Sequence, residues 1–334
     1  MSDFIVVMTD SAFDDCLLEA EILAKAGAEI RKYQTYDPRT VLELAKDADG
    51  ILCDYAPINR TVIEGLTKAR GIVVTGVGYD NVDIVAATER RIIISNDPEY
   101  MTYEVPEHTI ALILALARKI VPANAGSKKG EWNKFGEKYW NKVGPIFHLD
   151  GKTLGIIGFG RIGRKVARRM LGFEMKVLSY DPYVSDSVMR EYGVTKTDLE
   201  TVLQESDFIS IHSYLTPETF HLIGEKEFDL MKATAILVNT SRGKIIDQKA
   251  LVKALKTRKI SGAGLDVLER EPPDVGEEIL NLDNTIITPH MAAFSEKAQM
   301  TIRKLAAEEM ARILQGESPK YILNPEVLKP RPIE

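Results

Sequence analysis

The sequence has few cysteines, no long apolar run and no block of basic residues. Only two of its 334 residues are cysteines, and Cys16 and Cys53 lie apart in apolar patterns, which argues against a disulfide framework or a cysteine-rich metal site. The longest apolar run, 110–117, is too short to span a bilayer. The net charge of −6 includes no polybasic segment, so neither nucleic acid nor a membrane is an expected partner.

The amino-terminal residues are not those of an exported protein. Met1-Ser2-Asp3-Phe4 has no basic stretch before an apolar one, so we expect no signal peptide and a cytoplasmic location. A hydrophobic content of 45% and a charged content of 28% are typical of a globular protein. The length is sufficient for two domains, each with its own core.

The most informative stretch runs from Thr153 to Asp181. Residues 153–157 are typical of a short buried strand, and the glycine-rich segment 158–163 follows it directly. A helical pattern comes next, and a second apolar strand, 176–180, ends at Asp181. A strand, a glycine turn, a helix, a strand and an acid form the context of the dinucleotide-binding motif.

Each part of this motif has a physical role in binding a dinucleotide. Gly158 permits a tight turn, Gly160 allows the backbone to approach a pyrophosphate, and Gly163 allows the helix and the strand to pack closely. The amides and the positive end of the helix dipole then face the phosphates. Asp181 can accept hydrogen bonds from the ribose hydroxyls and repels a 2′-phosphate, so the sequence predicts NAD rather than NADP.

Strands alternate with helices both before and after residue 150, which predicts an α/β fold with two doubly wound parallel-sheet domains. We expect a substrate domain made of residues 1–100 and 299–334, and an NAD-binding Rossmann domain made of residues 101–298. Residues 121–150 carry four glycines and two prolines, so they are expected to be irregular. Trp132 and Trp140 in this segment suggest an arm that reaches a second subunit, and the alternative is a segment packed on its own subunit.

Polar residues follow several of the predicted strands, where ligands of open α/β sheets bind. Arg242 follows one strand, Asp266 and Glu271 follow the next, and His290 follows the last. A histidine can protonate the oxygen of a carbonyl that receives a hydride, and a nearby carboxylate favours its charged form. A guanidinium can grip a substrate carboxylate with two hydrogen bonds, and the amides near Gly78 can bind it as well.

Structural roles are the alternatives for these residues. His290 is otherwise a core histidine, Arg242 a structural partner of Asp266, and Glu271 a solvated loop residue. His108 and His221 lie in apolar helical patterns and are expected to be structural. His212 ends a strand of the nucleotide domain, where a place beside the cofactor and a structural role are equally expected.

Together these motifs resemble the D-isomer-specific 2-hydroxyacid dehydrogenases over essentially the whole chain. The motifs that carry the resemblance are Gly158 to Gly163 with Asp181, residues 239–243 (Asn-Thr-Ser-Arg-Gly), Leu265-Asp266-Val267 with Glu271-Pro272, and Thr288-Pro289-His290. Residues 99–108 are similar to the branch of C-terminal-binding proteins and phosphoglycerate dehydrogenases. The end of the chain is similar to glyoxylate reductases.

The resemblance implies a role for each matching residue. Arg242 is implied as the substrate anchor, His290 as the acid and base, and Glu271 as its carboxylate partner. Val77, Gly78 and Tyr100 are implied as further substrate contacts. The predicted cofactor contacts are Gly158, Gly160, Arg161, Ile162, Gly163, Asp181, His212, Thr216, Thr240, Asp266 and Ala292, and no metal site is expected. A homodimer joined through the nucleotide domains is also implied.

The same resemblance predicts the reaction and its substrates. We expect an NAD-dependent oxidoreductase that acts on small 2-oxoacids, with glyoxylate and hydroxypyruvate as first candidates. Phosphite dehydrogenases carry lysine at the position of Val77, and formate dehydrogenases carry glutamine at that of Glu271, so neither substrate is expected. The alternative is an NAD(H)-sensing scaffold of the C-terminal-binding-protein type, which has little turnover.

Overall fold

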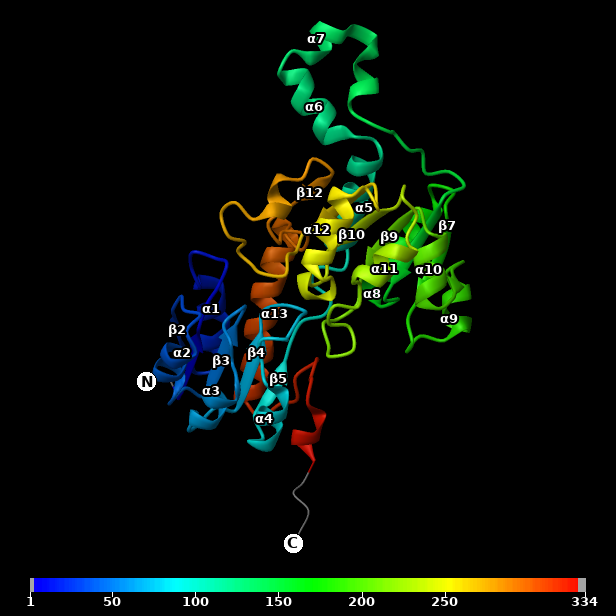
Figure 1. Cartoon of the computed structure of the whole chain (residues 1–334). Helices are drawn as coiled ribbons and strands as arrows, with labels where there is room; N and C mark the ends of the chain where they lie inside the picture. Colours follow the sequence, from blue (N-terminus) through cyan, green and yellow to red (C-terminus); the bar gives the residue numbers. More distant parts are fainter. Residues whose placement is uncertain (1–2, 330–334) are drawn as a thin grey trace. The chain divides into compact units, whose positions relative to one another are not determined.

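The structure, a computed structural model, describes residues 3–329, which divide into two compact units. The first unit extends to Met101 and includes the chain from Ser295 onward, and the second is Thr102–Phe294. Each unit contains one fully parallel sheet flanked by helices (Figure 1). The predicted α/β fold with two doubly wound sheets is therefore confirmed.

The first unit has a five-stranded sheet in the order β2-β1-β3-β4-β5. Its elements are β1 (Phe4–Met8), α1 (Leu17–Lys25), β2 (Ala28–Lys32), α2 (Pro38–Ala45), β3 (Gly50–Cys53), α3 (Arg60–Gly65), β4 (Gly71–Val74), α4 (Ile84–Glu89), β5 (Ile93–Ser95), α13 (Glu296–Leu314) and the 3-10 helix η4 (Pro325–Leu328). Strands β3 and β4 are short apolar runs that are buried along their whole length, as parallel strands between helices are, whereas the edge strand β2 has exposed residues.

Helix α13 covers one face of this first sheet, although it comes from the other end of the chain. Met310 and Ile313 on α13 pack against Val6, Leu52 and Val73 on the strands. Arg303 of α13 forms a nearly buried ion pair with Glu19 of α1, at 2.7 Å. Beyond α13, Asn324 accepts a hydrogen bond from Ile94 N and donates one to Ile92 O. The carboxyl-terminal segment is thus part of the first unit's core.

The second unit has a seven-stranded sheet in the order β12-β11-β10-β9-β6-β7-β8. Its elements are α5 (Glu104–Ala117), α6 (Ile120–Lys128), α7 (Glu131–Phe135), η1 (Gly136–Lys142), β6 (Thr153–Ile157), α8 (Arg161–Leu171), β7 (Lys176–Tyr180), α9 (Asp186–Glu191), β8 (Thr195–Lys196), α10 (Leu199–Glu205), β9 (Phe208–Ile211), α11 (Glu225–Leu230), β10 (Ile236–Asn239), η2 (Gly243–Ile245), α12 (Gln248–Lys256), β11 (Gly262–Leu265), η3 (Glu278–Asn281) and β12 (Thr285–Ile287).

Strand β6 lies inside this sheet, between β9 and β7, and the chain winds outward from it in both directions. Ile157 of β6 pairs with Tyr180 of β7 on one side and with Ile211 of β9 on the other. Apolar residues of α5 and α8 form the core on one face, and those of α10, α11 and α12 form it on the other. Ligands of such sheets bind where the strand order reverses, here beyond the carboxyl ends of β6 and β9.

Residues 120–142 form helices, so the prediction of an irregular segment from 121 to 150 is wrong for most of its length. Pro122 lies in the first turn of α6, where a missing N–H group costs little. Gly130 and Gly136 have φ angles of 80° and 54° and separate the short helices. The glycines therefore break the segment into pieces without preventing helix formation. In Figure 1, α6 and α7 extend away from the sheet of their unit.

No single helix within residues 3–329 is long and apolar enough to cross a membrane. Helices α5 and α6 satisfy the length and composition criteria only as a pair, and they are bent by 62° at the break between them.

Candidate active site

The glycine turn after β6 is shaped by a close approach to the residues that follow β9. Gly158 has a φ angle of 94°, and a Cβ atom there would lie 2.7 Å from the carbonyl carbon and oxygen of His212. A Cβ atom at Gly160 would meet nothing within 4 Å. The turn thus requires glycine at 158 for packing and leaves open space at 160, at the start of the eleven-residue helix α8. These features fit the phosphates of a dinucleotide.

Asp181 lies beside this turn, as the predicted cofactor site requires. Its Oδ2 atom accepts a hydrogen bond from Phe159 N at 2.7 Å, and its Oδ1 atom accepts one from Tyr183 N at 2.8 Å. Each carboxylate oxygen has a second lone pair, so Asp181 can still accept hydrogen bonds from ribose hydroxyls. The two backbone bonds hold the carboxylate in place next to the glycine turn.

His212 and Ser213 place polar atoms at the point where the strand order reverses. The Nε2 atom of His212 is 2.7 Å from Ser210 Oγ. His212 Nδ1 and Ser213 Oγ are both covered and have no hydrogen-bond partner among the described residues. Burial lowers the pKa of His212 to about 3, so its ring is neutral at physiological pH. Unsatisfied polar atoms beside the glycine turn are consistent with hydrogen bonds to a bound cofactor.

The turn after β10 is built by the side chain of Asn239. Its Oδ1 atom accepts from Ser241 N at 3.0 Å, and its Nδ2 atom donates to Arg242 O at 2.9 Å. Ser241 Oγ donates to Ile211 O at 2.7 Å, which ties the turn to the neighbouring strand β9. Arg242 is therefore presented from a turn with little freedom, and its Nη1 atom donates to Ser241 O at 3.0 Å.

Asp266 organises the loop that carries His290. Its buried carboxylate accepts hydrogen bonds from Thr288 Oγ1 at 2.6 Å, from Met291 N at 2.9 Å and from Ala292 N at 2.8 Å. Its backbone oxygen accepts from His290 N at 2.8 Å. His290 has a φ angle of 51°, a conformation that non-glycine residues adopt rarely and that the hydrogen bonds to Asp266 hold in place.

Glu271 and His290 form a hydrogen-bonded pair at the carboxyl ends of β11 and β12. The Nδ1 atom of His290 is 2.6 Å from Glu271 Oε2, and Leu268 N donates to Glu271 Oε1 at 2.9 Å. Burial alone would raise the pKa of Glu271, but the hydrogen bond and charge of His290, with a contribution from Arg242, hold it below its usual value of 4.5. Glu271 is therefore ionised near neutral pH and can stabilise a charged imidazole.

The three catalytic candidates thus lie on neighbouring loops of one sheet. The turn carrying Arg242 packs tightly against the loop carrying Glu271, because a Cβ atom at Gly243 would lie 1.9 Å from the carbonyl carbon and oxygen of Leu268. With Nδ1 of His290 bonded to Glu271, Nε2 is the ring nitrogen that can exchange a proton with a substrate. A fixed guanidinium and an acid–base pair suit reduction of a carbonyl next to a carboxylate.

The other predicted residues lie in both units. Among the cofactor candidates, Thr240 is buried with its Oγ1 atom 2.9 Å from Thr109 Oγ1, and Ala292 bonds to Asp266. Thr216 N donates to Thr219 Oγ1 in an exposed turn after β9. Arg161 and Ile162 begin α8. The three substrate candidates in the first unit are Val77 and Gly78, which follow β4, and Tyr100, which follows β5.

Several contacts of the site have no recognisable sequence signal. His108, expected to be structural, lies with Nε2 2.9 Å from Thr288 Oγ1 and 3.5 Å from Asp266 Oδ1. Gln248 and Glu269 exchange hydrogen bonds near Glu271. Among residues 3–329, no three His, Cys, Asp or Glu side chains are grouped to hold a metal ion.

Comparison with known proteins agrees with this chemistry. The sequence matches the family described as D-isomer specific 2-hydroxyacid dehydrogenase, NAD binding domain, over residues 110–292. It is 42% identical to a glyoxylate reductase of Korarchaeum cryptofilum over 88% of each chain. It is also 40% identical to a D-3-phosphoglycerate dehydrogenase of Methanocaldococcus jannaschii, over 96% of this chain and 59% of that protein.

A solved structure of a dehydrogenase is also similar to this chain. D-lactate dehydrogenase from Aquifex aeolicus, in a complex with NAD and lactic acid, has a TM-score of 0.85 and 30% identity, with 96% of this chain and 99% of that chain covered. These similarities favour the dehydrogenase over the scaffold alternative and confirm NAD as the cofactor. The chain is an NAD-dependent oxidoreductase acting on 2-hydroxy acids, and it belongs to the D-isomer specific 2-hydroxyacid dehydrogenase family.

Proposed function

We propose that the protein reduces small 2-oxoacids, with glyoxylate and hydroxypyruvate as its first substrates. The observation that carries this proposal is the hydrogen-bonded pair of His290 and Glu271 beside the turn of Arg242. The relatives named glyoxylate reductase favour a short side chain on the substrate. A 2-oxoacid presents a carboxylate and a carbonyl on adjacent carbons, which is the pattern that a guanidinium and an imidazolium together recognise.

Each residue of the proposed site has a separate role in the reaction. Arg242 binds the substrate carboxylate and polarises the carbonyl, and the amides of Val77 and Gly78 bind the carboxylate as well. Tyr100 contacts the rest of the substrate. His290 gives the proton on Nε2 to the carbonyl oxygen as it gains charge, and Glu271 stabilises the imidazolium before that transfer. Bound NADH supplies the hydride. In the reverse direction, neutral His290 accepts the hydroxyl proton.

The cofactor contacts in this proposal all belong to the second unit. Asp181 accepts hydrogen bonds from the adenosine ribose, and the amides around Gly160 at the start of α8 bind the pyrophosphate. The remaining contacts are proposed to come from Gly158, Arg161, Ile162, Gly163, His212, Thr216, Thr240, Asp266 and Ala292. The second unit is accordingly the nucleotide domain, and the first unit is the substrate domain.

A homodimer is part of the same proposal. Residues 120–142 carry four large exposed apolar side chains: Ile120, Val121, Trp132 and Trp140. Both tryptophans are more than 60% exposed, which supports a role for this segment in contact with a second subunit. The cytoplasmic location expected from the sequence stays a prediction.

The test is oxidation of NADH, followed by absorbance, with a panel of 2-oxoacids that includes glyoxylate, hydroxypyruvate, pyruvate and phosphohydroxypyruvate. We expect the highest kcat/KM with one of the first two. Tight binding of NADH without turnover of any 2-oxoacid would contradict the proposal. Preference for the phosphorylated substrate would instead assign the protein to the phosphoglycerate branch.

A further inference from the structure

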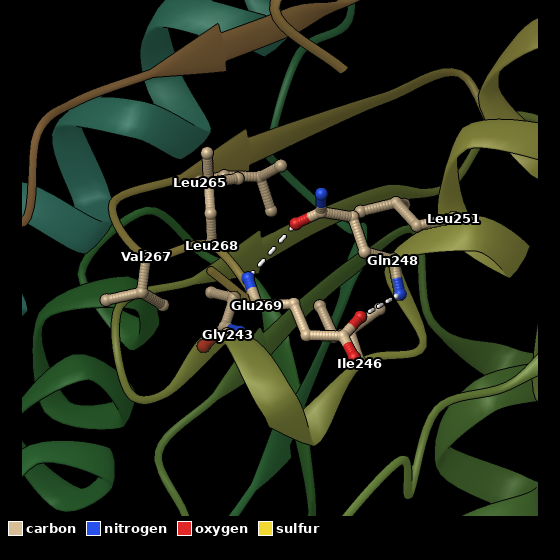
Figure 2. Close-up of a pocket in the computed structure, with 9 residues that line it drawn as sticks. Gly243, Ile246, Gln248, Leu251, Leu265, Val267, Leu268 and Glu269 are labelled. Atoms are coloured by element: carbon tan, nitrogen blue, oxygen red, sulfur yellow. Dashed lines mark hydrogen bonds between the residues drawn. The ribbon is translucent and has the colours of Figure 1, made fainter. Parts of the chain in front are cut away.

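The loop that carries Glu271 is held at both ends by one side chain, that of Gln248. Glu269 N donates to Gln248 Oε1 at 3.0 Å, and Gln248 Nε2 donates to Glu277 Oε1. The backbone N of Gln248 also donates to Glu269 Oε2 at 3.2 Å, so residues 248 and 269 are joined by two reciprocal bonds (Figure 2). Loop 269–277 is therefore fixed to Gln248 on either side of Glu271.

Gln248 is well placed for this task because it belongs to a rigid element. It is the first residue of α12, whose N-cap Asp247 accepts hydrogen bonds from the N–H groups of residues 249 and 250. The segment from Arg242 to Gln248 thus meets the Glu271 loop twice. Gly243 packs against Leu268, and Gln248 bonds to Glu269.

The space between these segments is too small for a ligand. Figure 2 shows residues that line the cavity beside Gln248, whose volume is about 10 Å³, room for roughly one water molecule. Its lining includes Gly243, Leu268 and Glu269. The contacts around it are consequently packing and hydrogen bonds within the protein. They join the start of α12 directly to the loop.

The hydrogen-bond pattern requires an uncharged amide at position 248. The donor Glu269 N fixes the amide oxygen on its side, so the NH₂ group faces the carboxylate of Glu277. Four carboxylates, Glu269, Glu271, Asp274 and Glu277, belong to the same loop. Glu269 also bonds to His221 Nε2 at 3.0 Å. A further carboxylate at position 248 would repel its neighbours. An apolar side chain there would remove the side-chain hydrogen bonds to Glu269 N and Glu277 Oε1 and leave only the backbone bond from Gln248 N to Glu269.

We propose that Gln248 is a positioning residue for Glu271 and, through it, for the proton held by His290. The inference rests on the proposed role of the Glu271–His290 pair. Glu271 is about one-third exposed, and its loop contains two prolines and a glycine whose neighbours are exposed. The Gln248 contacts and the single bond from Leu268 N hold the carboxylate at 2.6 Å from Nδ1 of His290.

The first variant is Gln248→Met, which keeps the length of the side chain and removes its hydrogen bonds. We expect kcat for 2-oxoacid reduction to fall about 10-fold or more, since displacements near 1 Å in an active site cost on the order of 100-fold. The KM for NADH should change less than about 3-fold, because the glycine turn is untouched. The alkaline fall in kcat should begin at a lower pH than in the wild type, because a displaced Glu271 favours the charged imidazole less. The other charged groups of the cluster, Arg242 and Asp266, are unchanged.

The second variant exchanges the donor and the acceptor. In the double variant Gln248→Glu with Glu277→Gln, the new carboxylate can accept from Glu269 N and from the new amide. We expect this protein to recover kcat to within about 3-fold of the wild type, whereas Gln248→Glu alone should be as impaired as Gln248→Met. The matched control is Gln204→Met, since Gln204 bonds to Glu200 at 2.9 Å on the exposed face of α10. It should leave kcat and the pH profile unchanged.

The outcomes separate this inference from the proposed function. Wild-type kcat and pH profile in Gln248→Met would overturn it, and so would a folded exchange variant with no recovery. His290→Ala is measured in parallel. Should that variant keep its full rate, the proposed function fails together with the inference. Should it lose activity while Gln248→Met does not, only the positioning role is overturned.

Discussion

Substitution of Gly243 by alanine tests whether contact between two loops sets the catalytic geometry. The added Cβ atom would lie 1.9 Å from the carbonyl carbon and oxygen of Leu268 and 2.5 Å from Glu269 N, whereas ordinary contact begins at 3.4 Å. The neighbouring atoms are all backbone, so no side chain can turn away. The loop of Glu271 and the turn of Arg242 must therefore separate by about 1.5 Å. A shift of this size costs on the order of 100-fold in rate.

The assay has two parts, steady-state reduction of the best 2-oxoacid and thermal unfolding. We expect kcat to fall about 100-fold or more. Overpacking should lower the free energy of unfolding by about 1–3 kcal/mol and the melting temperature by about 2–12 °C. Gly224→Ala is the control, because a Cβ atom there would lie 3.4 Å from Glu227 Oε2 and 3.9 Å from His221 O, which is ordinary van der Waals contact. A Gly243→Ala protein with wild-type rate and stability would refute the reasoning.

Three further predictions concern single side chains. His290→Ala should lower the rate of 2-oxoacid reduction about 10²–10⁴-fold with little change in NADH affinity, measured by kinetics and fluorescence titration; a full rate would exclude it from proton transfer. Asp181→Ala should weaken NADH binding and reduce the preference of the protein for NADH over NADPH. The same ratio of the KM for NADPH to the KM for NADH in the wild type and the variant would contradict the cofactor argument. Because burial lowers the pKa of His212 from 6.5 to about 3, the unfolded chain binds a proton first on acidification, and stability falls below pH 6.5. The free energy of unfolding falls by at most about 2 kcal/mol between neutral pH and pH 5. Chemical denaturation should show a smaller decrease for His212→Gln, and equal decreases in both proteins would show that His212 is not the cause.

The parts of the fold that sequence predicts best are those fixed by local chemistry. The glycine turn at 158–163 and Asp181 could be identified because each position has a steric or electrostatic requirement that few residues satisfy. Most strands include a run of apolar residues, and the structure places the strands in two parallel sheets as expected. The secondary structure of residues 120–142 was harder to predict, because the number of glycines alone does not distinguish a loop from short helices that meet at glycines.

The contacts that position the candidate site depend on the folded chain and could not be predicted. Gly243 reads as an ordinary turn glycine, and only the packing of Leu268 against it shows why a side chain is excluded. Gln248 reads as the start of a surface helix, yet its amide meets both ends of a loop more than 20 residues later in the chain. Such pairings join residues far apart in sequence, and no periodicity or spacing encodes them.

The return of α13 to the first sheet has a consequence for how the protein is made. Strands β1 to β5 leave the ribosome early, but Met310 and Ile313, which cover their apolar face, are added only after the whole second unit has been synthesised. The second unit is continuous in sequence and can fold as soon as it emerges. One apolar face of the first sheet stays uncovered until α13 has been synthesised. The amino-terminal strands are therefore the part of the nascent chain that is most vulnerable to aggregation.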